Sequence, residues 1–182
     1  MAEETRTTDR SPMLTGMFRD RQSAERAYTC LTSRGYTKDD ITLLMSDDTR
    51  RRHFSDDKTE LGSKAAEGAG VGAVVGGGLG ALLGGLAAAG MIALPGIGLI
   101  AMGPLAAAFA GGAIGAAGGG LVGALIGAGI PEEQARQYEH GIRQGNIVMG
   151  VSPRNDEDAQ YFEREWRNYR GEQIYRPTRR AA

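Results

Sequence analysis

One uncharged tract limits what this chain can fold into. From Gly68 to Pro131, 64 consecutive residues include no Asp, Glu, Lys or Arg, and they hold 22 of the 29 glycines. Every charged residue of the 182-residue chain therefore lies on either side of this tract. The sequence consists of two unlike parts, and each part requires its own structural interpretation.

Glycine recurs at every fourth residue in two places within the tract. The two series are Gly68, Gly72, Gly76, Gly80 and Gly84, and Gly111, Gly115, Gly119, Gly123 and Gly127. Positions four apart share one face of an α-helix, so each series would form a groove of bare backbone that a second helix can approach. In water each glycine costs a helix roughly 1 kcal/mol relative to alanine, whereas in hydrocarbon GxxxG is a packing face. The spacing predicts helix packing through these ten glycines.

The tract is long enough for two helices that cross a bilayer. Residues 68–94 and 105–130 each exceed the roughly 20 residues that a hydrocarbon core requires. Prolines and glycines interrupt the stretch between them, which predicts a turn there and a helical hairpin over 64–130. The first segment is rich in glycine and alanine, so its insertion into lipid would be marginal. A hairpin buried within a soluble self-assembly is the alternative.

The residues before the tract predict half of a small domain. Residues 1–11 are expected to be disordered, and within 12–46 we expect a strand at 13–18, a helix at 21–34 and a strand at 41–45. Ala24, Ala27, Tyr28 and Leu31 form one apolar stripe on that helix. A strand, helix and strand in this order predict parallel strands with a right-handed connection. Residues 47–63 are expected to be a charged linker.

The residues after the tract predict the other half of the domain, a further helix and a tail. Within 131–152 we expect a helix from Pro131 to about Gln144 and a strand at 147–151. A C-terminal helix within 153–170 begins with the capping residue Asn155, and its stripe of Phe162, Trp166 and Tyr169 is typical of core packing. Residues 171–182 are expected to be a basic tail.

This order of elements predicts an α+β protein. We expect a small ferredoxin-like βαβ…αβ domain, interrupted by the glycine hairpin in place of its third strand and followed by the C-terminal helix. The first strand should lie in the middle of the sheet, with the third antiparallel beside it.

Sequence motifs for catalysis or cofactor binding are weak. Gly96, Gly98 and Ala101 form a GxGxxA string, but no clear strand precedes it and no acidic residue follows at the distance of a ribose partner. The chain has two histidines and one cysteine, far apart in sequence, whereas a zinc site needs three or four such ligands. We expect no catalytic residue, no cofactor, no metal and no small-molecule substrate. The net charge of −1 does not favour a nucleic-acid partner.

Charge predicts the orientation of a membrane hairpin. The N-terminus is charged and lacks the apolar core of a secretory signal, so we expect the first half in the cytoplasm. Two crossings return the second half to the same side. Basic residues flank the tract and are absent from the connecting turn, as the positive-inside rule prefers. The expected location is the inner membrane with both termini in the cytoplasm, or the cytoplasm if the assembly is soluble.

Three stretches resemble the small bacterial general stress proteins, a family that includes heat-induced and low-temperature-induced members. They are LTGMFRDRQSAERAYTCLTSRGYTKDDITLLM, AAEGAGVGAVVGGGLGALLGGLAA and the segment ALPGIGLIAMGPLAAAF through IPEEQARQYEHGIRQGNIVMGV. The resemblance covers roughly Leu14 to Val151. It implies a βαβ unit, a glycine-zipper hairpin and an αβ unit, with no enzymatic activity and no catalytic residues. The C-terminal helix and the tail lie outside it.

Three functions remain open. The first is a non-enzymatic stress-response protein that a self-associating hairpin anchors in the lipid bilayer, with a cytoplasmic α/β domain. The second is a soluble homo-oligomeric scaffold whose hairpins bury one another. The third is a regulatory module that binds a ligand or a protein on its α/β face, which rests on fold analogy alone.

Overall fold

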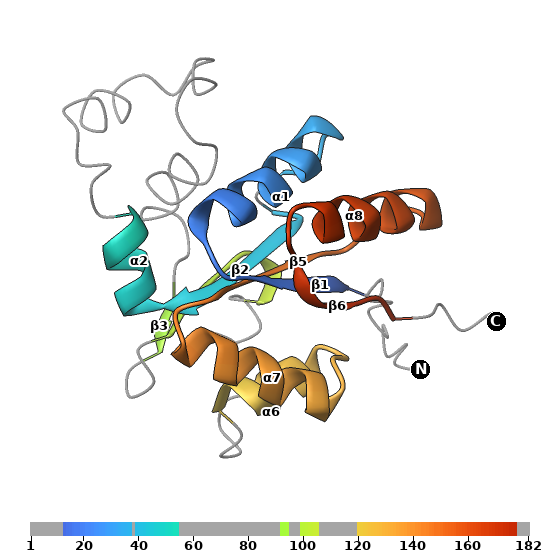
Figure 1. Cartoon of the computed structure of the whole chain (residues 1–182). Helices are drawn as coiled ribbons and strands as arrows, with labels where there is room; N and C mark the ends of the chain where they lie inside the picture. The colour runs from blue at the N-terminus through green and yellow to red at the C-terminus, as the bar shows by residue number, and fades with distance from the viewer. Residues whose placement is uncertain (1–12, 38, 55–91, 95–98, 106–119, 178–182) are drawn as a thin grey trace, which may run out of the picture.

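A computed structural model describes residues 13–37, 39–54, 92–94, 99–105 and 120–177 (Figure 1). The elements in chain order are β1 (Leu14–Phe18), α1 (Arg21–Ser33), β2 (Ile41–Ser46), α2 (Asp47–Phe54), β3 (Ile92–Leu94), β4 (Leu99–Met102), α6 (Gly120–Gly127), α7 (Glu132–Arg143), β5 (Ile147–Val151), α8 (Asp156–Asn168) and β6 (Glu172–Tyr175). Most of the uncharged tract lies outside the described residues. So do the expected disordered N-terminus at 1–11 and the last residues of the tail.

The strands form one antiparallel sheet in the order β3-β4-β2-β5-β1-β6. Within it, β2-β5-β1-β6 form a four-stranded antiparallel sheet in which β5 pairs with β1 from Leu14↔Val151 to Phe18↔Ile147. On its other side β5 pairs with β2, beginning at Ile41↔Val151. Because β1 and β2 both run opposite to β5, they point in the same direction, as the βαβ prediction requires. The predicted α+β class is confirmed.

Helices cover both faces of the sheet (Figure 1). The helices α1 and α8 pack on one face, where Phe18, Leu31, Phe162 and Trp166 belong to one buried cluster. The helices α6 and α7 pack on the other face, and their buried cluster includes Tyr138. Every residue of β1 and β5 is buried. This burial explains why neither strand carries a charged residue and why neither alternates between apolar and charged positions.

The sequence prediction for α1 is confirmed. The carboxylate of Asp20 accepts a hydrogen bond from Ser23 N at 2.8 Å and caps the first turn. The helix ends before Gly35, whose φ of +77° is the left-handed conformation that terminates many helices. The predicted apolar stripe, which includes Tyr28 and Leu31, is buried against the sheet.

The predicted C-terminal helix is confirmed, whereas the assignment of the following residues to a tail is wrong. The helix α8 is part of the domain core, because Phe162 and Trp166 are fully buried. Residues Glu172–Tyr175, expected to be part of a tail, form β6 and pair with β1. The strand β5 pairs with one side of β1, where the third strand of the predicted domain belongs. The strand β6 pairs with the other side of β1. Nothing in the short sequence EQIY marks a strand, since its partner is known only once β1 is placed.

The charged linker expected at 47–63 begins as a helix, α2. The hydroxyl of Ser46 accepts a hydrogen bond from Thr49 N at 3.1 Å and caps its first turn. Asp47 forms ion pairs with Arg50 at 3.1 Å and Arg51 at 2.6 Å, at the spacing where helical neighbours meet. High charge therefore did not exclude a helix here, because opposite charges recur three and four residues apart. The rest of that linker, 55–63, lies outside the described residues.

At the centre of the predicted helical hairpin the structure shows strands instead of a helix end and a turn. Residues Ile92–Leu94, expected to end the first long helix, form β3, and Leu99–Met102, expected to lie in the turn, form β4. The strand β4 pairs antiparallel with β2 at four positions, from Leu43↔Met102 to Ser46↔Leu99. Within the described residues, no helix is both long enough and apolar enough to cross a bilayer.

Candidate functional site

The structure describes two of the ten glycines predicted to pack helices. Gly123 and Gly127 lie on α6, where Gly123 is half-buried and Gly127 is exposed. The other eight lie outside the described residues. They are Gly68, Gly72, Gly76, Gly80, Gly84, Gly111, Gly115 and Gly119.

The helix α6 contacts the rest of the domain through its larger residues. Leu121, Ala124 and Leu125 are buried in the cluster shared with α7. The side that holds Gly123 and Gly127 also holds Ile126, which is 43% exposed. The described contacts of α6 therefore use the leucine side and leave the glycine side facing outward.

The attachment of β4 to β2 is the point where the tract meets the domain. Leu105 N donates a hydrogen bond to the buried Thr42 hydroxyl at 3.4 Å. Gly103 has a φ of +84°, and a Cβ at this position would overlap the Ile41 carbonyl oxygen. Only glycine permits both the conformation and the close approach. Ala101 is fully buried with Leu44 beneath α6 and α7.

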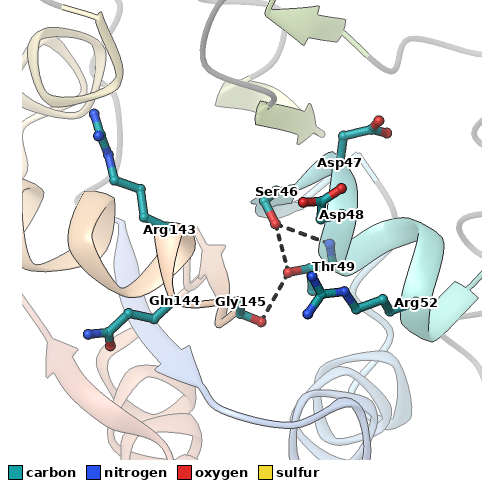
Figure 2. Close-up of a pocket in the computed structure, with 8 residues that line it drawn as sticks. All are labelled: Ser46, Asp47, Asp48, Thr49, Arg52, Arg143, Gln144 and Gly145. Carbon is teal, nitrogen blue, oxygen red and sulfur yellow. Dashed lines mark hydrogen bonds between the residues drawn. The ribbon is translucent and has the colours of Figure 1, made fainter.

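A polar hollow of about 370 Å³ lies between α2 and the C-terminal end of α7 (Figure 2). Thr49 forms its floor, because its hydroxyl donates to Gly145 O at 3.1 Å and lies 2.8 Å from the Ser46 hydroxyl. Arg52 and Arg143 line the hollow from opposite sides. Thr49 is buried and fully engaged in this bridge, so it connects α2 to α7.

The hollow has no excess of charge of one sign, which a binding site for a charged ligand would have. Asp47 and Asp48 line the hollow together with its two arginines, and Arg143 is engaged with Glu139 at 3.0 Å. Positive and negative groups are therefore balanced around it. Its polar contacts hold α2 against the end of α7 rather than converge on one point.

A buried polar network joins α8 to the first half of the chain. The Tyr36 hydroxyl donates to Asp158 Oδ2 at 2.7 Å and accepts from Arg154 N at 2.8 Å, and Arg34 reaches Asp158 Oδ1 at 2.5 Å. Burial by itself would raise the pKa of Asp158, but hydrogen bonds from Tyr36 and Arg34 outweigh it and hold this pKa below its usual range. The Arg154 guanidinium lies over the Tyr36 ring at 4.3 Å. The network stabilises the contact between α1 and α8.

A second polar contact joins α7 to the C-terminal strand. The Tyr138 hydroxyl donates to Gln173 O at 2.7 Å and lies 2.8 Å from the Thr15 hydroxyl, and Gln134 Nε2 also donates to Gln173 O. Gln173 has a φ of +49°, which a residue with a side chain rarely adopts. Burial raises the pKa of Tyr138 to about 12. Two donors on one carbonyl compensate for the strained backbone there.

The cysteine and the described histidine on α7 show no sign of a catalytic or metal-binding role. Cys30, on α1, is buried, and burial raises the pKa of its thiol, which disfavours the reactive thiolate. His140 is exposed on α7 and lies 2.9 Å from Gln144 Nε2. Within the part of the chain that the structure describes, no three His, Cys, Asp or Glu side chains could together hold a metal ion.

The sequence contains signals for the features it did not predict. The run Leu99–Met102 is a short apolar segment between glycines, and Pro95 with Gly96 separates it from the apolar Ile92–Leu94. Two short apolar runs around a Pro-Gly turn are typical of a β-hairpin. Ser46 followed by two aspartates is likewise a helix-start signature.

Comparisons with known proteins add no family to these observations. No family model, no curated protein and no solved structure matches the chain.

Proposed function

We propose that this chain is a non-enzymatic protein of the bacterial general stress response that associates with copies of itself through its glycine-rich tract. The stress assignment rests on the sequence resemblance. The observation that carries the self-association is that the uncharged tract is attached to a folded α/β domain at β3, β4 and α6. The domain would then present the outward glycine side of α6, with Gly123 and Gly127, to a second copy.

The finer fold assignment belongs to the same proposal. The segments β1, α1, β2, β5, α8 and β6 follow the order βαββαβ, and the strand order β2-β5-β1-β6 suits a ferredoxin-like domain. The tract, with α7 behind it, would then be an insertion between the second and third strands. This differs from a fold in which the tract replaces the third strand.

The lengths between attachments favour association over membrane crossing. Residues 106–119 run between Leu105, which contacts β2, and α6, which packs on α7. As a helix this segment would extend about 21 Å, less than the roughly 30 Å of a hydrocarbon core. Residues 55–91 likewise leave the domain after α2 and return to it at β3. Two crossings would need roughly 40 apolar residues, and the uncharged part of this segment begins only at Gly68.

A second candidate is a membrane anchor with the α/β domain and both termini on the cytoplasmic side of the inner membrane. The absence of charge from Gly68 to Pro131 favours it, as do the two four-residue glycine spacings. This topology requires β3 and β4 to leave β2 and to form the turn on the far side of the bilayer. The two candidates therefore differ in the location of one described hairpin.

Fractionation and light scattering test both candidates. We expect the full chain, expressed without detergent, to remain in the high-speed supernatant as a homo-oligomer by size exclusion with light scattering. Gly76→Leu and Gly119→Leu should reduce its mass, because a leucine fills the groove that a neighbouring helix would enter. Thr29→Leu adds the same side chain at an exposed position of α1 and should leave the mass unchanged.

Each outcome selects one account. A protein that sediments with membranes and is released only by detergent supports the anchor and overturns the soluble assembly. A monodisperse monomer in the supernatant overturns both.

A further inference from the structure

The two edges of the four-stranded sheet are protected in different ways. At one edge β6 is short, its pairing with β1 shifts between Thr15 and Met17, and it carries the charged Glu172. Irregular pairing and charge discourage the addition of another strand. At the opposite edge β2 has the sequence ITLLMS, with no charge, and its residues Ile41 to Met45 are all buried. The edge at β2 therefore depends on β4 for its protection.

Helices cover both faces of β2, and β4 adds the buried Ala101 to the core on one of them. Leu43 and Met45 lie in the cluster beneath α1 and α8, and Leu44 lies in the cluster beneath α6 and α7. Both faces of β2 are thus fixed by helices, while its outer backbone groups pair with β4. Main-chain hydrogen bonds provide much of the contact at such an edge, and Gly103 and Ala101 fit β4 to it.

The strand β4 is connected to the domain by long segments. Residues 55–91 precede the β3-β4 hairpin, and residues 106–119 separate it from α6. Even the shorter segment can extend to about 45 Å, whereas a domain of about 110 residues is roughly 35 Å across. The same hairpin can therefore reach β2 of its own chain or β2 of a neighbouring copy.

We propose that β2 is a strand-addition site and that β4 of a second copy occupies it in the assembled protein. This inference rests on the proposed self-association, because the glycine tract must first bring two copies together. The exchanged pairing keeps every contact of the closed form, including Gly103 against Ile41 and the hydrogen bond from Leu105 to Thr42. Exchange of an identical element costs little, since the contacts are the same and only the connection changes.

Disulfide trapping tests the exchange. The register places Leu44 opposite Ala101, and directly opposed residues of antiparallel strands have Cβ atoms close enough for a disulfide. In a full-length Cys30→Ala background, Leu44→Cys and Ala101→Cys are placed in separate chains with tags of different size and then co-expressed and oxidised. We expect a mixed disulfide dimer in this sample and its loss when either variant is expressed alone.

Two controls make every result decisive. A single chain carrying both cysteines must form the disulfide if β2 and β4 pair, and circular dichroism reports whether each variant is folded. In the second control, a chain with Thr29→Cys, at an exposed position of α1, is co-expressed with the Ala101→Cys chain in place of the Leu44→Cys chain. Thr29 does not lie opposite Ala101, so we expect no mixed dimer.

The outcomes separate this inference from the proposed function. An oligomer without mixed dimers, in which the doubly substituted chain closes its own disulfide, overturns strand exchange and leaves self-association standing. A doubly substituted chain that is folded but forms no disulfide overturns the pairing of β2 with β4 itself. A monomeric protein overturns both the exchange and the self-association.

Discussion

The two faces of the sheet are held by different kinds of residue. Beneath α1 and α8 the core contains large aromatic side chains, and the rings of Phe18 and Trp166 meet edge to face at 5.6 Å. Beneath α6 and α7 the core is mainly aliphatic, with alanines at several contacts, and Tyr138 is its one buried aromatic residue among those described. The first face is built from segments on either side of the tract, whereas the second takes α6 and β4 from the tract itself.

This difference separates a fixed part of the molecule from an adaptable one. Aromatic rings bury large areas in specific orientations, so the α1–α8 face determines one arrangement of the domain. Small residues bury little area each and allow backbones to approach closely. We therefore expect substitutions on the α6–α7 face to have smaller effects on stability than substitutions on the α1–α8 face.

The largest effect is expected on the aromatic face. Trp166→Ala removes a fully buried side chain, so the free energy of unfolding should fall by about 3–5 kcal/mol. Urea denaturation followed by far-UV circular dichroism measures this loss. Tryptophan fluorescence cannot be used, because Trp166 is the only tryptophan and the variant lacks it. Asn168→Ala, on the exposed side of the same helix, should change little. A loss below about 1 kcal/mol for Trp166→Ala would show that α8 is not part of the core.

The next effect tests the attachment of β4. Gly103→Ala combines an unfavourable backbone conformation with an overlap against Ile41, so it should cost about 2–4 kcal/mol. Gly129→Ala is its matched control, because Gly129 also has a positive φ, of +89°, but nothing lies within 4 Å of the added Cβ. The control should cost only about 1 kcal/mol. Equal costs for the two variants would place Gly103 away from β2, as the membrane topology requires.

Acid should weaken the fixed face through Asp158. Because the folded pKa of this carboxyl lies below its usual value, its contribution is complete above about pH 4. The contribution is lost as the pH falls through the lowered folded value, where the proton displaces the interaction with Arg34. Asp158→Asn should reduce stability at pH 7 by about 1–2 kcal/mol.

The comparison with wild type checks the role of Asp158. The stability difference between wild type and Asp158→Asn should shrink as the pH is lowered below 4. A difference that stays constant from pH 7 to pH 2 would contradict the pKa assignment.

The smallest effect is expected at the contact between α7 and β6. Tyr138→Phe should cost about 1 kcal/mol, because Gln134 still donates to the Gln173 carbonyl. In the wild type the pKa of Tyr138 is about 12, so the folded state keeps this phenol neutral where the unfolded chain ionises it. Stability should therefore fall as the pH rises above about 10. In Tyr138→Phe the free energy of unfolding should fall less steeply above about pH 10 than in the wild type. An equally steep fall would mean that other tyrosines cause it.

Local patterns predicted the elements that carry them, and long-range pairing determined the rest. The stripe on α1, the cap at Asn155 and the stripe of Phe162 and Trp166 are visible in the sequence and confirmed in the structure. The strand β6 was missed, since four residues of mixed character become a strand only beside β1. The strand β4 was missed because its apolar run lies among prolines and glycines that predict a turn between two helices.

The candidate site followed the same division. The glycine spacings identify positions that could pack helices, and they are local features of the sequence. Gly103 carries no such periodicity, and its role depends on Ile41, more than sixty residues earlier in the chain. The contact between Gly103 and Ile41, which attaches the tract to the domain, therefore could not be predicted from local sequence patterns.

The central position of β5 has a consequence for synthesis. The strand β2 leaves the ribosome about 100 residues before β5, so at 5–20 residues per second it waits roughly 5–20 s for that neighbour. The strand β4 emerges about halfway through this interval and can pair with β2 first. The hairpin would then cover the outer edge of β2 early in synthesis, while the opposite edge stays open until translation delivers β5.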